Sequence, residues 1–63
     1  MQVFVNGTAR EVNLGTTLHD LLEEFRQKKS IVVGEINGEI SLDEKRLLQE
    51  GDRIEIVTFV GGG

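Results

Sequence analysis

The sequence predicts an α+β fold in which a mixed β-sheet packs on one α-helix. Two Asn-Gly pairs, Asn6-Gly7 and Asn37-Gly38, each follow a short apolar segment and are typical of tight hairpin turns. Leucines at helical spacing stand between these two hairpins. The segment Ile54 to Val60 is rich in β-branched residues, which indicates a final strand. Two hairpins, one helix and one strand are therefore expected.

The two hairpins are expected to supply four strands. Residues 3–5 lead into the first Asn-Gly pair, and residues 8–12 return antiparallel. Residues 31–36 lead into the second pair, and residues 39–41 return. Gly34 stands inside the third strand, where a glycine indicates either a bulge or a close contact.

A helix is expected to run from Leu18 to Lys28. Thr17 stands three residues before Asp20, a spacing typical of an N-terminal capping box with a short acid. Acidic residues lie toward the start of this segment and basic residues toward its end, which suits the helix dipole. Its apolar face is expected to enter the core, with Leu18, Leu21, Leu22 and Phe25.

The segment from Leu42 to Leu48 mixes charges with leucines and predicts an irregular connection or one short helical turn. The last strand is expected to begin after Gly51-Asp52. Alternation along it predicts that Ile54, Ile56, Thr58 and Val60 face the helix, and that Arg53, Glu55, Val57 and Phe59 face away.

Val57 and Phe59 would then be large apolar residues on the outside of the sheet, next to the C-terminal end. We predict that they form a partner interface. An alternative stays open, in which Phe59 covers the sheet edge or a loop.

The order of these elements is that of a ubiquitin-like β-grasp. Sixty-three residues are enough for one small domain, which we place at residues 1–60. Residues 61–63 would form a flexible C-terminal glycine tail.

Composition excludes several function classes. Eleven acidic and seven basic residues give a net charge of −4, which opposes nucleic-acid binding. Without cysteine and with one histidine, the sequence predicts no metal site. No glycine-rich loop with phosphate-binding spacing is present, and His19 is expected to be a solvated surface imidazole rather than a catalytic base. The chain is therefore expected not to be an enzyme.

No secretory signal and no stretch of membrane-spanning length is found in the sequence. We therefore expect a cytoplasmic protein that does not bind membranes. Its acidity favours encounter with a basic protein surface.

Three glycines, Gly61, Gly62 and Gly63, directly follow the last strand. Without a Cβ atom, such a segment can thread a narrow channel in another protein and present a terminal carboxylate. Taken alone, the same residues also fit a frayed chain end.

The sequence resembles the ThiS family, the small sulfur carrier proteins of thiamine biosynthesis, over nearly its whole length. The last segment is the most specific part: Leu48, a Gly-Asp turn, an Ile-Glu-Ile strand and the terminal glycines. Further matching residues are Val5-Asn6-Gly7, Thr17-Leu18, Leu21-Leu22, Glu35-Ile36-Asn37-Gly38-Glu39 and Gln49 to Val57. Residues 41–48 match the family poorly.

The resemblance implies a carrier that binds no cofactor itself and is expected to be a monomer when free. A ThiF-like adenylating enzyme would use ATP to convert the carboxylate of Gly63 to an acyl-adenylate, while Gly61 and Gly62 thread the enzyme's channel. A persulfide sulfur donor would then leave a thiocarboxylate on Gly63. A ThiG-like thiazole synthase would take this sulfur to build the thiamine thiazole.

Three alternatives remain. The small subunit of molybdopterin synthase also carries sulfur on a diglycine end, but its members commonly place prolines before the final segment, and this chain has none. A ubiquitin-like interaction module would work through its surface and needs no free glycine terminus. A protein modifier would join the same carboxylate to lysine amines.

Overall fold

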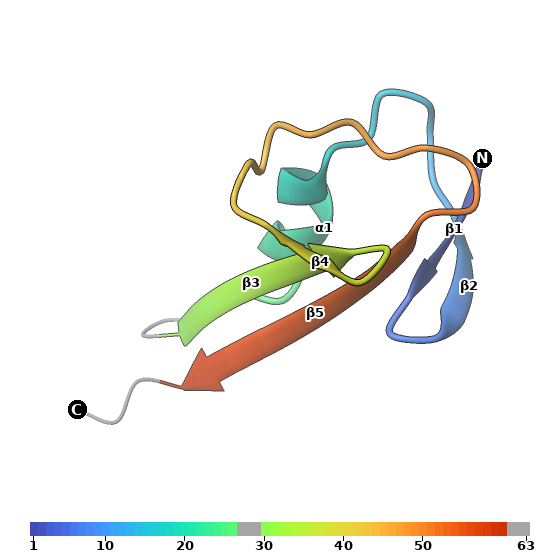
Figure 1. Cartoon of the computed structure of the whole chain (residues 1–63). Coiled ribbons are helices and arrows are strands. Elements are labelled where there is room, and N and C mark those ends of the chain that lie inside the picture. The colour runs from blue at the N-terminus through green and yellow to red at the C-terminus, as the bar shows by residue number, and fades with distance from the viewer. Residues whose placement is uncertain (27–29, 61–63) are drawn as a thin grey trace.

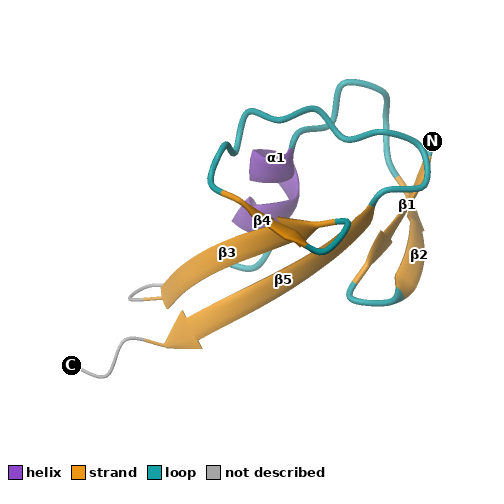
Figure 2. Ribbon diagram, viewed as in Figure 1, coloured by secondary structure: helices purple, strands orange, loops and turns teal. Residues whose placement is uncertain are grey.

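The computed structural model describes residues 1–26 and 30–60, which form a five-stranded sheet and one helix. The sheet order is β2-β1-β5-β3-β4, in which β1 and β5 are parallel and all other neighbours antiparallel. The helix lies on one face of this mixed sheet (Figures 1 and 2), as the sequence predicts. The elements are β1 (Gln2–Val5), β2 (Thr8–Glu11), α1 (Leu18–Glu23), β3 (Ser30–Ile36), β4 (Glu39–Ser41) and β5 (Arg53–Val60).

Both predicted hairpins form, and their turns explain why each needs an Asn-Gly pair. Asn6 and Gly7 have φ angles of 50° and 85°, and Asn37 and Gly38 have 53° and 89°. Two successive left-handed residues define the type I′ turn, whose twist matches that of the flanking strands. Asparagine is one of the few residues with a side chain that tolerates this conformation.

The predicted capping box starts α1. The Thr17 hydroxyl accepts a hydrogen bond from the backbone N–H of Asp20 at 3.3 Å, and the Asp20 carboxylate accepts one from the N–H of Thr17 at 2.9 Å. The bond from the Thr17 backbone is the main reason that the pKa of Asp20 is below its usual value. Two N–H groups without a helical partner are therefore satisfied.

The helix is shorter than predicted and ends at Glu23. The next amides, those of Glu24 and Phe25, bond to carbonyls three residues back, at 3.2 and 3.0 Å, so the chain tightens out of the α-helix. The prediction of basic residues in the last turn is therefore wrong for the described helix. Lys28, the predicted helix end, lies outside the described residues.

The core lies between α1 and the sheet. Its buried apolar residues are Val3, Val5, Leu18, Leu21, Leu22, Val32, Ile36, Leu48 and Ile54. Phe25, predicted to be in this core, is only partly buried against it. Gly34 shows why β3 needs a glycine, because a Cβ there would lie 2.9 Å from Cδ1 of Leu18. Gly34 thus marks a close contact, and the β3–β5 register runs through it without a bulge.

The connection from β4 to β5 is irregular, and its described residues contain no helical turn. It runs antiparallel beside the start of α1, where the N–H of Leu18 bonds to the carbonyl of Arg46 at 3.0 Å. The N–H of Leu48 bonds to the carbonyl of Thr16 at 2.9 Å, and the Leu48 side chain is buried. The connection therefore closes the core without secondary structure of its own.

Within residues 1–26 and 30–60, no helix is long and apolar enough to span a membrane.

Candidate functional site

The strand β5 directly precedes the three glycines and is the scaffold of the candidate site. It pairs with β3 along nearly its whole length, from Ile54 to Val60. On its other side it pairs with β1 only at Arg53 and Ile54. The predicted reactive and threading residues, Gly63, Gly62 and Gly61, lie outside the described residues.

Two asparagine side chains, one from each hairpin turn, hold the backbone of β5. Oδ1 of Asn6 accepts a hydrogen bond from the N–H of Ile56 at 2.8 Å. Oδ1 of Asn37 accepts one from the N–H of Arg53 at 3.0 Å. These bonds extend the pairing of β5 where the neighbouring strands turn away. Sequence reasoning treated both asparagines only as turn residues, because a turn motif does not show where its side chain points.

A buried carboxylate supports the start of β5. Asp52 is 6% exposed. Its Oδ1 accepts a hydrogen bond from Nδ2 of Asn37 at 3.0 Å, and its Oδ2 accepts one from the N–H of Gln49 at 2.8 Å. The second hairpin turn, the β4–β5 connection and β5 are thus joined through one side chain.

Val57 and Phe59 lie on the face of the sheet that is turned away from α1. Val57 is 39% exposed and Phe59 is 57% exposed. In the β3–β5 register Val57 stands opposite Val33, and Phe59 opposite Ile31. We call these four residues the outer apolar patch.

Sequence reasoning missed Val33 and Ile31 as members of this patch. Alternation within residues 31–36 was a usable signal, because it places both residues opposite to the buried Val32 and Ile36. Without the strand register, however, their position beside β5 could not be known.

The helix-facing side of β5 is covered for only half of its length. Ile54 is buried and Ile56 is partly buried, as predicted, but Thr58 is exposed. The prediction of an inward Thr58 is therefore wrong in terms of burial. The reason is the short α1, because the far halves of β3 and β5 extend beyond it (Figure 1). The side chain of Val60 is not described.

Acidic residues border the outer apolar patch. Glu35 and Glu55 stand directly opposite each other on β3 and β5, two pairs from Val33 and Val57 and on the same face of the sheet. Like charges placed opposite each other destabilise a sheet. The pair therefore concentrates negative charge on this face and lowers the stability of the free protein.

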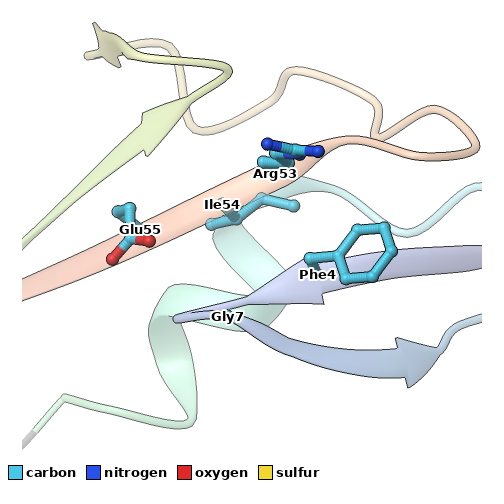
Figure 3. A pocket seen from close by; sticks show the side chains of 5 residues that line it. All are labelled: Phe4, Gly7, Arg53, Ile54 and Glu55. Atoms are coloured by element: carbon cyan, nitrogen blue, oxygen red, sulfur yellow. The ribbon is translucent and has the colours of Figure 1, made fainter.

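A hollow of about 330 Å³ lies where β1 leaves β5 (Figure 3). It is lined by Phe4, Gly7, Arg53, Ile54 and Glu55. Its wall includes one cationic, one anionic and one aromatic residue. The hollow can therefore hold a single amphipathic side chain.

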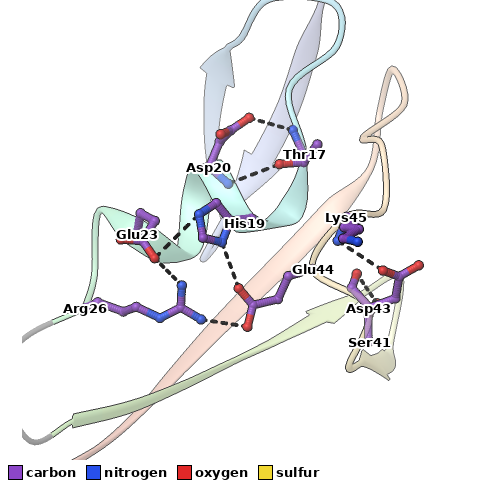
Figure 4. Close-up of polar contacts among 9 residues, drawn as sticks. All are labelled: Thr17, His19, Asp20, Glu23, Arg26, Ser41, Asp43, Glu44 and Lys45. Atoms are coloured by element: carbon purple, nitrogen blue, oxygen red, sulfur yellow. Dashed lines mark hydrogen bonds and ion pairs between the residues drawn. The ribbon is translucent and has the colours of Figure 1, made fainter.

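His19 lies in a cluster of ion pairs on the helix (Figure 4). Its side chain is half exposed, with Nδ1 3.0 Å from Oε1 of Glu44 and Nε2 3.6 Å from Oε1 of Glu23. Arg26 pairs with both carboxylates and, together with His19, holds the pKa of Glu44 below its usual value. The imidazole is thus at the surface, as predicted, but it is partnered. The cluster joins α1 to the β4–β5 connection.

The residues that the structure describes contain no group of three or more His, Asp or Glu side chains placed to hold a metal ion.

A family model, described as the ThiS family, matches residues 3–63. The chain belongs to the ThiS family. The match to the ThiS family includes the terminal glycines, which lie outside the residues that the structure describes.

Two curated proteins are similar to this ThiS-family chain. The sulfur carrier protein ThiS of Escherichia coli (strain K12) is 32% identical over 66 residues, which cover 100% of both chains. An uncharacterized protein, ycf40, of Trieres chinensis is 41% identical over 63 residues, covering 95% of this chain and 86% of its own.

The fold agrees with a solved ThiS structure. The crystal structure of the thiamine biosynthesis protein ThiS from Geobacter metallireducens superposes with a TM-score of 0.71 at 30% sequence identity, and the match covers 100% of both chains. The predicted ubiquitin-like β-grasp is therefore confirmed.

Proposed function

We propose that this ThiS-family chain is a sulfur carrier of thiamine biosynthesis that carries its cargo on the carboxylate of Gly63. The observation that carries this proposal is the end-to-end match to the sulfur carrier of Escherichia coli, which covers 100% of both chains. Because the family match includes residue 63, it supports a function located at the terminal glycines.

The chemistry requires activation of the carboxylate by a partner. A carboxylate is a poor acyl donor, so the Gly63 oxygen first attacks the α-phosphorus of ATP and pyrophosphate leaves. A persulfide sulfur then attacks the acyl carbon of the adenylate and AMP leaves. Cleavage of the resulting sulfur–sulfur bond by a further thiol yields the thiocarboxylate. ATP is bound by the adenylating enzyme, and the carrier binds no cofactor.

In this proposal the carrier is a co-substrate and not an enzyme. Gly61 and Gly62 thread the channel of the adenylating enzyme, where the lack of a Cβ permits close approach of the two backbones. A thiazole synthase then receives the sulfur. The free carrier is a cytoplasmic monomer that meets these partners in turn.

The outer apolar patch is the surface that we assign to partner binding. Phe59 and Ile31 are more than half exposed, and both lie on the outer face of the sheet, near the C-terminal end of β5 and the start of β3. Exposed aromatic side chains are common anchors of protein interfaces. The neighbouring Glu35–Glu55 pair favours a partner with basic residues around an apolar centre.

The direct test is the intact mass of the full chain after incubation with ATP, a cognate ThiF-like enzyme and a persulfide donor. We expect the mass to rise by the difference between a sulfur and an oxygen atom. Cleavage that releases a short C-terminal peptide would show whether this mass gain lies on Gly63. An unchanged mass with a demonstrably active enzyme would contradict the carrier function, and conjugates to lysine amines would indicate a protein modifier instead.

Phe59→Ala is expected to weaken binding to the adenylating enzyme by about tenfold, because truncating an interface anchor commonly costs more than 1 kcal/mol. The melting temperature should change little, since the side chain is 57% exposed. Titration calorimetry of the carrier into the enzyme measures the affinity.

Leu42→Ala is the matched control, because Leu42 is 86% exposed but lies on the β4–β5 connection, outside the outer apolar patch. Its affinity should stay within about twofold of the parent, as is usual for residues outside a hot spot. Equal losses for both variants would show that the outer apolar patch is not the docking surface.

A further inference from the structure

One edge of β5 is open in the half that leads to the tail. The carbonyls of Asp52 and Ile54 accept hydrogen bonds from Phe4 and Asn6 on the β1 side, at 2.9 and 2.8 Å. The N–H of Ile56 is the next group on this side and bonds to the Asn6 side chain. There the pairing ends, because β1 ends at Val5 and its turn leads away.

The backbone groups beyond this point follow from the alternation of the strand. Arg53, whose carbonyl accepts from the N–H of Asn37, directs its hydrogen-bonding groups toward β3, as do all odd-numbered residues of β5. The carbonyl of Ile56 and both backbone groups of Thr58 therefore point to the open side. Within the ranges 1–26 and 30–60, no hydrogen-bond partner reaches these groups of Thr58 from that side.

We propose that this open edge binds an extended segment of the adenylating enzyme, which adds to the sheet as a further strand beside Ile56 and Thr58. The inference rests on the proposed function and names how the partner grips the strand that carries the tail. Unpaired N–H and C=O groups in a row at a sheet edge specify another extended backbone as their partner. Pairing would hold the tail in line with the enzyme's own segment.

The edge lacks the features that normally prevent such pairing. Exposed edge strands are usually protected by a charge, a proline or a bulge. From Ile56 to Phe59 the strand has no charged residue and no proline, and its pairing with β3 shows no bulge. The edge strand β2, in contrast, is four residues long and carries Arg10 and Glu11.

The surroundings favour a different protein over a second copy of this chain. Each copy carries a net charge of −4, so two edges brought together would repel each other, whereas a basic segment would be attracted. The edge also joins the outer apolar patch on one side and the hollow beside Phe4 at its end. The hollow carries both Arg53 and Glu55 beside the apolar Phe4, so it suits an amphipathic side chain of the added segment.

Backbone hydrogen exchange, followed by NMR residue by residue, tests the contact directly. In the free carrier the amide of Thr58 should exchange faster than those of Val57 and Phe59, which face β3. On addition of the adenylating enzyme and a non-hydrolysable ATP analogue, exchange at Thr58 should slow at least tenfold. Unchanged exchange at Thr58 in a complex that adenylates normally would overturn the edge contact while leaving the carrier function intact.

A pair of variants separates the backbone from the side chain. Thr58→Pro removes the N–H that faces the open edge, and a proline is tolerated where a strand's N–H points to solvent. Thr58→Val removes only the hydroxyl. Thr58→Pro should raise the KM for the carrier in the adenylation assay at least tenfold, and Thr58→Val should leave it within twofold.

Three further results would overturn the inference. Equal KM values for Thr58→Pro and Thr58→Val would show that the amide is not used. Protection of Thr58 that grows with carrier concentration in the absence of enzyme would assign the edge to a second copy. Lack of adenylation of the unmodified chain would remove the proposed function itself. The exchange measurement decides the question even if Thr58→Pro fails to fold, because it uses the unmodified chain.

Discussion

Replacing Gly62 with valine is expected to lower the rate of thiocarboxylate formation by about 100-fold or more, a loss typical of misplaced reacting groups. A β-branched side chain restricts the backbone torsions of the penultimate residue and widens the chain where it must pass through the enzyme's channel. The melting temperature should not change, because every described buried apolar residue lies between Val3 and Ile54. Loss of transfer with unchanged folding is the signature of a threading defect.

The measurement is the initial rate of adenylation and of the mass gain, with thermal unfolding recorded on the same samples. Gly62→Ala is the graded control, since its single methyl group restricts the backbone less than valine does. It should retain more activity than Gly62→Val. Full thiocarboxylate formation by Gly62→Val would show that the threading proposal is wrong.

Replacing Ile54 with alanine is expected to lower the free energy of unfolding by about 2 to 5 kcal/mol, the usual cost of a large-to-small change in a core. Ile54 is 1% exposed and stands at the start of β5, opposite Ile36 and paired in parallel with Val5. Small domains are stable by only about 5 to 15 kcal/mol. The variant should therefore melt at least about 8 °C lower, since 1 kcal/mol shifts a domain of this size by about 4 to 8 °C.

Urea unfolding at equilibrium measures this loss, and Ile40→Ala provides the control. Ile40→Ala removes the same atoms as Ile54→Ala, but Ile40 lies on β4 and is 66% exposed. Its free energy of unfolding should stay within about 0.5 kcal/mol of the parent. Similar losses for both variants would contradict the assignment of the core to the helix-facing side of the sheet.

The elements that local residues determine could be predicted from the sequence. The two Asn-Gly turns and the Thr17–Asp20 capping box depend only on neighbouring residues, and all three form as expected. The end of α1 comes earlier than local propensity predicts, because the amides of Glu24 and Phe25 bond to carbonyls three residues back. The β4–β5 connection folds against α1 through long-range backbone bonds that no local pattern shows.

The candidate site could be predicted only where it depends on a local pattern. Alternation along one strand was enough to place Val57 and Phe59 on the outer face. Ile31 and Val33 belong beside them only because of the register of a second strand, and the exposure of Thr58 follows from the length of a helix elsewhere. The open edge of β5 depends on which part of β5 lies beside β1, and the sequence pattern does not show this pairing. The chemical assignment of Gly63 stays a proposal based on family membership.

The two asparagine contacts to β5 fix the register of the strand that precedes the terminal glycines. Asn6 and Asn37 bind the amides of Ile56 and Arg53, so they fix which residue of the strand lies at each position of the sheet. A slip of one residue would change the distance between the sheet and the terminal carboxylate by about 3.3 Å and turn Phe59 toward the helix side. In the proposed function, an enzyme that docks on the outer face therefore finds the last residue of the strand, to which the terminal glycines are joined, at a fixed position. The two hairpin turns at the start of β5 thus determine where its other end lies, next to the residues that we propose to react.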